Sequence, residues 1–268
     1  ALPIFTVLED LGVKINLVFM QTASSDSNNT SISDNNEYDI CVKKLKKCNG
    51  LKLAHLNVCS MYRKLDELRF LLMKINLDIL CISETWLSQT TSDNLISIDG
   101  YTLFRRDRSD GRRGGGVCIY AKNTLSCIER YDLSDTSLEA IWIELMLPSS
   151  EKLLLCCLYR PPDSNIEYFN NMLDAFEKAT DEPSDLLILG DLNIDYKMDE
   201  SLHENQINLI ENLFLLTQMI NKPTRVTTSS STCIDHLLSS IPQKHIICDV
   251  AQISMSDHYM IYTCINTI

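Results

Sequence analysis

Hydrophobic and polar positions follow two periods from residue 51 onward. Short apolar runs that stop at polar residues predict buried strands at 51–58, 78–82, 117–121, 140–147, 153–159, 186–189, 234–238, about 246–253 and 260–265. Apolar residues three and four positions apart predict amphipathic helices at 65–75, 166–176 and 207–214, with Asp163 as the N-cap of the second. Many strands with few helices between them indicate an α/β fold in which two sheets pack together.

The first fifty residues lack these periods. Residues 22–36 are almost all Ser, Thr, Asn, Asp or Ala, which is typical of a disordered linker. A basic cluster follows, made of Lys43, Lys44, Lys46 and Lys47. We therefore expect residues 1–50 to be an N-terminal extension, partly a disordered linker and dispensable for chemistry, and residues 51–268 to be one domain.

Composition narrows the class of protein. With 45% hydrophobic and 22% charged residues, the chain has the balance of an ordinary globular protein. No run of 18 apolar residues exists, so we expect no membrane span. Charges at Glu9, Asp10 and Lys14 interrupt any signal-peptide core, and the eleven cysteines are scattered, which favours reduced core thiols in an intracellular protein that is not secreted.

The net charge of −12 disfavours a protein that simply coats nucleic acid, because such binding depends on releasing counterions with many Lys and Arg. It is compatible with an enzyme that uses acidic residues to hold a metal. Residues 105–113 contain five arginines and two aspartates, a local surplus of positive charge. This segment is either a solvated loop or a contact for a polyanion.

Polar residues stand where several predicted strands end. Four such ends are Asn57, Ser83-Glu84, Gly190-Asp191-Leu192-Asn193 and Ser256-Asp257-His258. A single Asp after a strand is more often a turn former, and we interpret the other histidines as structural, namely His55, His203, His236 and His245. The repeated pattern nevertheless indicates a site, since strand ends that meet at one sheet edge are where α/β proteins bind ligands.

Five motifs carry a resemblance to a known family. They are Ser83-Glu84-Thr85-Trp86-Leu87, Tyr159-Arg160-Pro161-Pro162, Gly190-Asp191-Leu192-Asn193, Ile234-Asp235-His236 and Ser256-Asp257-His258. In this order they resemble the exonuclease–endonuclease–phosphatase superfamily. The first two motifs and the turn from Gly111 to Val117 resemble the apurinic-type endonuclease of non-LTR (LINE-like) retrotransposons. The resemblance covers residues 51–268 and implies a four-layer α-β-β-α sandwich, two mixed sheets with helices outside.

The resemblance also implies a set of site residues. Glu84 would be the principal ligand of Mg²⁺, or of Mn²⁺, with Asn57 and Asp257 completing or orienting the metal site. Asp191 would position and deprotonate the attacking water, and Asn193 would hold that water or the phosphate. His258, oriented by a hydrogen bond to Asp235 on a neighbouring strand, would donate to the scissile phosphate, as would the Tyr159 hydroxyl. We expect DNA contacts from Arg105, Arg106, Arg112 and Thr224.

Hydrolysis of a phosphodiester needs a hard cation, a deprotonated water and donors to the phosphate oxygens, and these residue types supply all three. The expected function is Mg²⁺-dependent nicking of one DNA strand. We expect the protein to act in the nucleus as a monomer. A reverse transcriptase domain, absent from this chain, is the expected partner. Alternatives on the same fold are an abasic-site nuclease, an RNA deadenylase or a phosphoinositide phosphatase. The alternative from another class is a catalytically silent remnant that binds nucleic acid or protein.

Overall fold

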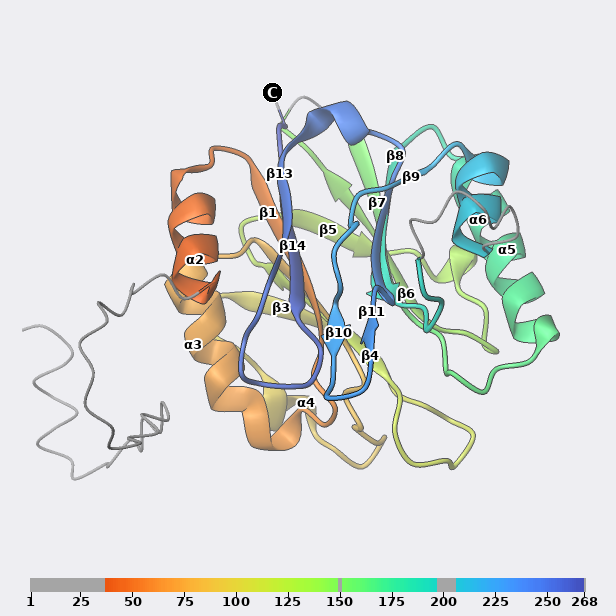
Figure 1. Cartoon of the computed structure of the whole chain (residues 1–268), viewed down its shortest axis with the longest axis horizontal. Helices are drawn as coiled ribbons and strands as arrows, with labels where there is room; N and C mark the ends of the chain where they lie inside the picture. Colours follow the sequence, from red (N-terminus) through yellow and green to blue (C-terminus); the bar gives the residue numbers. More distant parts are fainter. Residues whose placement is uncertain (1–36, 149–150, 197–205, 268) are drawn as a thin grey trace, which may run out of the picture. The chain divides into compact units, whose positions relative to one another are not determined.

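Two mixed six-stranded sheets lie face to face at the centre of the fold (Figure 1). The first sheet has the strand order β13 (His245–Ala251), β14 (Met260–Ile265), β1 (Leu51–Asn57), β2 (Ile79–Ser83), β4 (Val117–Lys122) and β3 (Tyr101–Arg106). The second has the order β5 (Ser126–Glu129), β6 (Glu139–Met146), β7 (Lys152–Tyr159), β8 (Asp185–Asp191), β12 (Asp235–Ser239) and β9 (Thr217–Gln218). The computed structural model describes residues 37–148, 151–196 and 206–267.

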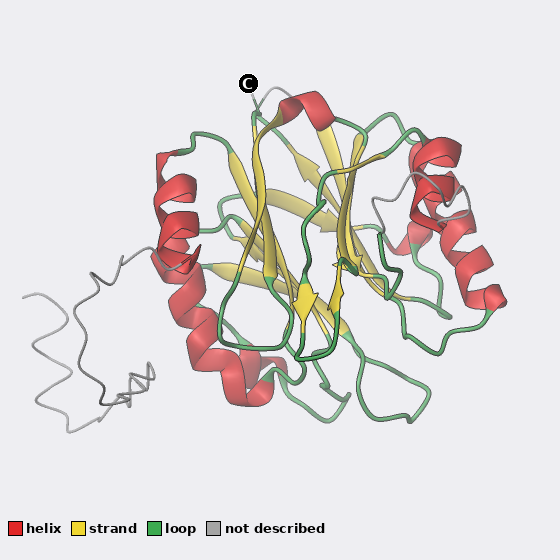
Figure 2. Cartoon of the chain, viewed as in Figure 1, coloured by secondary structure: helices red, strands yellow, loops and turns green. Residues whose placement is uncertain are grey.

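Helices cover the outer faces of both sheets, as Figure 2 shows. On the first sheet lie α2 (Glu37–Lys47), α3 (Leu65–Ile75) and the short α4 (Asp93–Ile96); on the second lie α5 (Ile166–Thr180) and α6 (Gln206–Phe214). Short 3₁₀ turns (Tyr62–Lys64, Tyr131–Leu133, Pro242–Lys244) and the small hairpin β10 (Arg225–Val226) and β11 (Ser231–Thr232) complete the elements. This arrangement confirms the predicted four-layer sandwich.

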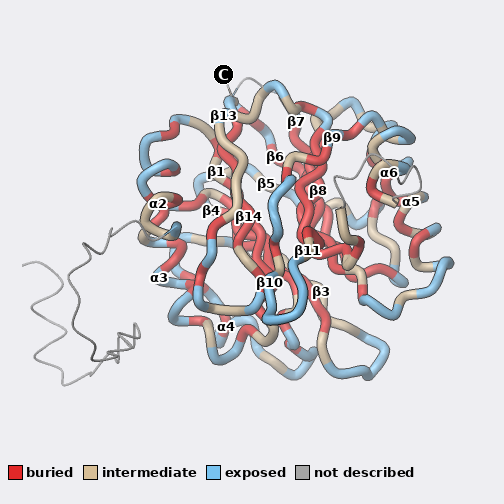
Figure 3. The backbone as a smooth tube through the Cα atoms, in the orientation of Figure 1, coloured by how far each residue is buried: buried red, intermediate tan, exposed pale blue. Residues whose placement is uncertain are grey.

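Apolar side chains fill the three layers between these elements, and the central strands of both sheets are buried along most of their length (Figure 3). Between the sheets, Leu53 and Ile119 of the first pack with Ile143, Leu155 and Leu189 of the second. Burial on both faces explains why these strands read as nearly continuous apolar runs. All eleven cysteines are free, and most are buried, as predicted. In the part of the chain that the structure describes, no helix has the length and apolar character that crossing a membrane requires.

Helix α2 changes the predicted domain boundary. Its apolar side, formed by Cys41, Val42 and Leu45, is buried in the same core as Leu68 and Tyr262. The lysines that suggested a basic cluster lie on the exposed side of this helix, and the apolar residues between them, which were not predicted to be part of the core, are buried. The compact unit therefore begins before Leu51, whereas the polar stretch at 22–36 lies outside the described residues.

Two local expectations also differ from the structure. The N-cap of α5 is Asn165, whose side-chain oxygen accepts a hydrogen bond of 3.0 Å from the backbone N–H of Tyr168, whereas Asp163 lies 3.3 Å from Arg112. Arg105 and Arg106 belong to a strand, β3, and not to a loop. Both differences arise because capping and strand pairing depend on where the neighbouring backbone lies.

Candidate active site

Strand pairing brings the predicted polar residues to one edge of the sandwich. The parallel strands β1 and β2 end side by side, with Asn57 opposite Ser83, and Glu84 follows directly. In the other sheet, the last residue of β8, Asp191, lies opposite Asp235 on one side and Tyr159 on the other. Residues far apart in the sequence are thus neighbours because the strands that carry them end, or in the case of β12 begin, at the same edge.

Asp191 is buried and accepts hydrogen bonds on both carboxylate oxygens. The Asn57 side-chain amide donates to Oδ2 over 2.8 Å, and the backbone N–H of Asn193 donates to Oδ1 over 3.0 Å. The Asn193 side chain in turn donates to the carbonyl of Arg160 over 2.8 Å. Burial raises the pKa of Asp191 to about 7, and the charge of Asp235 adds to the rise, while His258 and Asn57 oppose it. The carboxyl can therefore exchange a proton near neutral pH.

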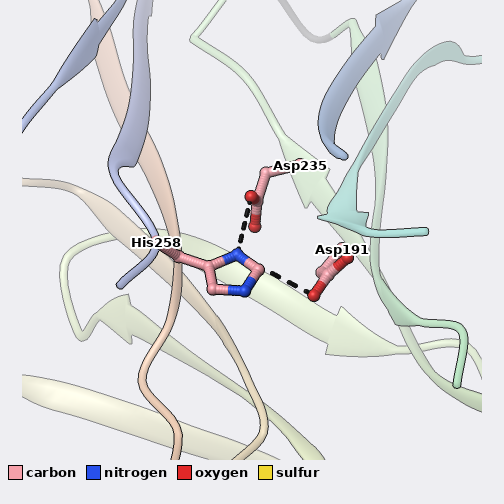
Figure 4. Close-up of side chains that lie close together, drawn as sticks. All are labelled: Asp191, Asp235 and His258. Carbon is pink, nitrogen blue, oxygen red and sulfur yellow. Dashed lines mark hydrogen bonds and ion pairs between the residues drawn. The ribbon is translucent and has the colours of Figure 1, made fainter. Parts of the chain in front are cut away.

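His258 and Asp235 form the predicted hydrogen-bonded pair, shown with Asp191 in Figure 4. His258 Nδ1 lies 2.8 Å from Asp235 Oδ2 and 3.9 Å from Asp191 Oδ2. The pair joins the two sheets, since Asp235 begins β12 and His258 precedes β14, whereas we expected neighbouring strands. Burial lowers the pKa of His258, but the hydrogen bond and charge of Asp235, with the charges of Asp191 and Asp257, raise it above its ordinary value.

Glu84 lies on a segment with unusual backbone geometry. Glu84 and Trp86 both have φ of 56°, in the left-handed region that non-glycine residues seldom adopt. The indole N–H of Trp86 donates to Glu84 Oε2, and the Tyr159 hydroxyl hydrogen-bonds to the same carboxylate. Burial first, and then Glu84, raises the pKa of Tyr159 above its ordinary value, so the phenol keeps its proton. Glu84 and Tyr159, predicted for different roles, are therefore in direct contact.

Cys59 lies among the three predicted metal ligands and was not anticipated. Its Sγ is 3.3 Å from Asn57 Oδ1 and 3.6 Å from Asp257 Oδ1. Burial raises the pKa of Cys59 to about 12, and the charges of Asp257 and Glu84 add to the rise, so the thiol is neutral. No motif around Cys59 distinguishes it from the other cysteines of the sequence, and its position became evident only from the packing.

Arg225 is a second residue that sequence reasoning missed. Its Nε lies 2.8 Å from Asp257 Oδ2. Burial raises the pKa of Asp257, but Arg225 and His258 lower it by more, so the carboxylate is ionised. Arg225 also forms an isolated β-bridge with His258, which places the hairpin β10–β11 beside the site.

The donor atoms fit a hard cation. Glu84, Asn57 and Asp257 offer carboxylate and amide oxygens, the ligands that Mg²⁺ prefers, around the neutral thiol of Cys59. Asp191, Asp235 and His258 form a second group, whose potential ligand atoms lie within 4.8 Å of one another. In that group the hydrogen bond to Asp235 occupies Nδ1 of His258, whereas in the set around Glu84 the backbone N–H of Cys59 donates to Asn57 Oδ1 over 3.0 Å and Arg225 pairs with Asp257 Oδ2.

The four predicted DNA contacts lie in different environments. Arg105 is largely buried, pairing with Asp93 at 2.7 Å and with Asp107, and Arg106 donates to the carbonyl of Asp135 over 2.8 Å. Thr224 is completely buried, and its hydroxyl accepts from the backbone N–H groups of Ile234 and Asp235 at 3.1 and 3.0 Å. Arg112 is half exposed. Arg105 and Thr224 therefore position backbone segments instead of facing a ligand, and of the four, Arg112 has the exposure that a DNA contact requires.

The remaining histidines have internal partners. His55 is fully buried, with Nε2 3.0 Å from Ser83 Oγ and Nδ1 3.6 Å from Asp235 Oδ1, and burial lowers its pKa to about 4. His236 lies 2.8 Å from the carbonyl of Ile194, and His245 contacts Thr263 and Ser239. These contacts agree with the predicted structural roles, although His55 lies directly beneath Asp235. His203 is outside the described residues.

Comparisons with known proteins agree with this fold. The family described as "Endonuclease/Exonuclease/phosphatase family" matches residues 51–258. Among solved structures, the endonuclease domain of TRAS1, a telomere-specific non-LTR retrotransposon, has a TM-score of 0.64 at 14% identity, covering 81% of this chain and 98% of its own. The AP endonuclease LMAP from Leishmania major has a TM-score of 0.64 at 15% identity, covering 81% and 87%.

A third similar structure is the 3′ phosphatase NExo from Neisseria bound to a product DNA hairpin, with a TM-score of 0.61 at 17% identity, covering 81% and 99%. No curated protein matches the chain. At these identities the solved structures share a fold with this chain, and the chemistry has to be argued from its own side chains.

Proposed function

Since the chain belongs to the endonuclease/exonuclease/phosphatase family, we propose that it is a Mg²⁺-dependent endonuclease that nicks one strand of DNA and leaves a 3′-hydroxyl and a 5′-phosphate. Membership in this family by itself gives the chain a phosphoesterase fold. The observation that carries the proposal is the connected group Asn57–Asp191 and Asp235–His258, in which a buried carboxyl and a buried imidazole lie 3.9 Å apart at the sheet edge. The Glu84 and Tyr159 motifs of retrotransposon endonucleases favour DNA as the substrate.

Asp191 is the base in this proposal. The two donors from Asn57 and Asn193 fix the direction of its carboxylate, so that it can hold a water and take a proton from it as the water attacks phosphorus. Asn193 adopts φ of 50°, which turns its backbone N–H back onto Asp191. A raised pKa near neutrality suits a group that must accept a proton in this step.

His258 is the donor to the phosphate. Nδ1–H donates to Asp235, so when the ring is an imidazolium its second proton is on Nε2, from which it can be donated to a phosphate oxygen. The raised pKa of His258 favours the imidazolium form, which stabilises the negative charge that develops there. The Tyr159 hydroxyl donates to Glu84 in the free protein, and it would become the second donor to the phosphate by exchanging that hydrogen bond for one to a phosphate oxygen.

The metal site is formed by Glu84, with Asn57 and Asp257. Bound there, Mg²⁺ would neutralise charge on the phosphate and on the leaving oxygen. Trp86 and Tyr159 hold the Glu84 carboxylate from two sides, and Arg225 holds that of Asp257, so each charged ligand has a fixed orientation before any cation binds.

Incubation with supercoiled plasmid tests the activity. With Mg²⁺ or Mn²⁺ we expect conversion to the open-circular form, and with EDTA no conversion. Asp191→Asn, which keeps shape and removes the base, is the matched variant, and it should bind Mn²⁺ while losing nicking. Intact plasmid under all conditions with a folded protein would favour the silent binding remnant.

Oligonucleotides separate the alternative substrates. We expect nicking of an unmodified duplex at rates comparable to or above those on a duplex with one abasic site or a 3′-phosphate. Cleavage confined to the abasic duplex, or release of phosphate alone, would replace the proposal with a repair nuclease or a phosphatase.

We further propose that the protein acts as a monomer in the nucleus, with reverse transcription supplied by another domain.

A further inference from the structure

A buried ion pair next to the candidate site joins the two sheets. Arg108 belongs to the loop between β3 and β4 of the first sheet, and Glu139 is the first residue of β6 in the second. Arg108 Nε and Nη2 lie 2.8 and 2.7 Å from Glu139 Oε1. The side chains are 10% and 11% exposed, so solvent screens the pair little.

Each residue of the pair makes a hydrogen bond to the backbone in or next to the glycine turn Gly114-Gly115-Gly116. Glu139 Oε2 accepts from the backbone N–H of Gly116, and Arg108 Nη1 donates to the carbonyl of Arg113 over 3.1 Å. Gly115 has φ of +68°, and a Cβ built there would lie 2.3 Å from Glu139 Oε2. Glycine is therefore required at this position by both conformation and space.

The same turn holds the segment that carries Glu84. The backbone N–H groups of Thr85 and Trp86 donate to the carbonyls of Gly116 and Gly115 over 3.2 and 2.9 Å. A Cβ added to Gly114 would lie 3.6 Å from Glu84 Oε2 and from Trp86 Nε1, so the turn lies beside the carboxylate with room for little more than a methyl group between them. Left-handed φ values such as those of Glu84 and Trp86 persist where surrounding contacts impose them, and the turn supplies such contacts.

Tyr159, the partner of Glu84, is held by the same pair. The Arg108 guanidinium lies over the Tyr159 ring at 5.8 Å from its centroid. The Tyr168 hydroxyl accepts from the backbone N–H of Glu139 over 3.1 Å and donates to the carbonyl of Tyr159 over 2.8 Å. Tyr159 is thus in contact with the Arg108 side chain and is linked through Tyr168 to the backbone of Glu139.

Stability alone does not account for this pair. Removing two charges from water costs free energy, and well-packed apolar residues of similar volume often stabilise a fold as well or better. Burial raises the pKa of Glu139 even though Gly116 and Arg108 lower it, and the charge of Glu84 adds to the rise. Its surroundings therefore disfavour the ionised carboxylate, as is expected where a charged group is placed for its geometry instead of for stability.

We propose that Arg108 and Glu139 are a positioning pair for the Glu84 side of the site, which fixes the glycine turn against Glu84 and Trp86 so that the carboxylate keeps the direction a cation requires. The part of this statement that concerns the cation rests on the proposed function. The part that concerns Trp86 and Glu84 rests on the geometry alone, so the two can fail separately.

The test uses the full chain with both sides of the pair made apolar, Arg108→Met with Glu139→Leu. The control is the pair Arg130–Glu144, at 2.9 Å with side chains 14% and 8% exposed, changed to Met and Leu in the same way. Glu144 lies on the same strand as Glu139, five residues away or roughly 17 Å. The control therefore matches burial and strand but not location, and it breaks more ion pairs, because Arg130 also pairs with Asp132 and Glu182 and Glu144 with Lys152.

Two readouts are independent of turnover. The chain has two tryptophans, so 5-fluorotryptophan labelling produces two ¹⁹F resonances, from Trp86 and Trp142. We expect the Arg108/Glu139 variant to shift and broaden the Trp86 resonance, and to weaken Mn²⁺ binding, measured by electron paramagnetic resonance, by about 10–100-fold. The control variant should leave the Trp86 resonance in place and Mn²⁺ affinity within about twofold, below that range.

Conservative variants keep the test usable if the apolar pair does not fold. Arg108→Lys keeps the charge but loses the planar fork, and Glu139→Gln keeps the shape but loses the charge. Each should shift the Trp86 resonance by less than the apolar pair does and weaken Mn²⁺ binding by less. An unchanged Trp86 resonance and Mn²⁺ affinity in folded variants would overturn the proposal, as would equal losses in the control. If the unsubstituted protein neither bound Mn²⁺ nor cut DNA, the proposed function would fail, and the Trp86 resonance would still decide the positioning role.

Discussion

The two ends of the candidate site are constructed differently. At the histidine end, formed by Asp191, Asp235 and His258, the two aspartates lie at paired positions of β8 and β12, and Asp235 orients His258 through a direct side-chain hydrogen bond. At the glutamate end, formed by Glu84, Trp86 and Tyr159, orientation comes from left-handed backbone at two residues and from a glycine turn held by an ion pair behind it. Both arrangements cross the two sheets, but the first does so through direct contact between the site's own side chains, and the second through backbone and packing behind them.

This difference predicts different sensitivities to substitution. At the histidine end, the chemical identity of each side chain carries the effect, because the strands hold the backbone whatever the side chain is. At the glutamate end, a change that leaves Glu84 itself intact can still alter it, because the positive φ of 56° persists through contacts made by other residues. Residues without any reactive group therefore become important there.

The largest effect should come from the histidine end. His258→Ala should raise the barrier to nicking by about 3–4 kcal/mol, the scale of losing one strong donor to developing negative charge. Asp235→Asn should cost less, because the ring remains and loses only its orienting charge. The double variant should cost clearly less than the sum, since the two act as a unit. Single-turnover nicking at saturating Mg²⁺ measures all three, and additive losses would show that the pair does not act as a unit.

Glu84→Ala tests the other end directly. We expect Mn²⁺ affinity to fall by more than about 100-fold, beyond the loss typical of residues that only support a ligand, because the main carboxylate ligand is removed. Raising the Mg²⁺ concentration should restore part of the nicking, whereas it should not rescue His258→Ala. Unaltered Mn²⁺ titration curves for the Glu84 variant would move the metal site to the Asp191, Asp235 and His258 group.

A pair of glycine variants isolates the packing behind the glutamate end. Gly115→Ala and Gly100→Ala both place a side chain at positive φ, of +68° and +84°, but only at Gly115 would the new Cβ meet other atoms. We expect Gly100→Ala to cost about 1 kcal/mol of unfolding free energy with normal nicking, and Gly115→Ala to cost more and to lower Mn²⁺ affinity. Urea denaturation measures the stability of both variants, and Mn²⁺ titration measures their affinity for the cation. If the two variants behaved alike, the glycine turn would have no specific role in positioning Glu84.

The smallest effect should come from a charge cluster outside both ends. Asp249 lies 2.7 Å from Lys44 of α2 and 2.6 Å from Lys222. Burial raises the pKa of Asp249, but the two lysines lower it by more than burial raises it, so that the pKa falls to about 2. A lowered pKa in the folded state stabilises the protein above the ordinary value of 3.8, and this stabilisation disappears as the pH falls toward 2.

We expect Asp249→Asn to lose about 1 kcal/mol of unfolding free energy near neutral pH, a value reduced for the partial exposure of its partners. The difference from the unsubstituted chain should shrink as the pH falls from about 5 toward 3, because the carboxylate becomes protonated. Nicking rates should stay normal. A difference in stability that does not change with pH would mean that packing, and not charge, accounts for the loss.

The sequence by itself determined the elements and most of the candidate residues. The period of the apolar residues identified strands and helices such as β8 and α3, because burial of one face or both imposes that period on the chain locally. Polar residues that follow apolar runs in the sequence, among them Glu84, Asp191 and His258, were recognisable for the same reason, since burial ends where the polar residues begin. Their roles came from the order of the motifs.

The tertiary structure decided which of these residues meet and what holds them. Helix α2 carries lysines on one side and three buried residues on the other, and only packing reveals which side matters. Arg105 and Arg108 come from one arginine-rich segment, yet Arg105 pairs with Asp93 and Asp107 away from the site, whereas Arg108 reaches Glu139 beneath Tyr159. The physical reason is that the period of apolar residues reports burial along one element only. Contacts between the sheets depend on strand register and loop geometry, which bring Arg108 and Glu139 together although they are 31 residues apart in the sequence.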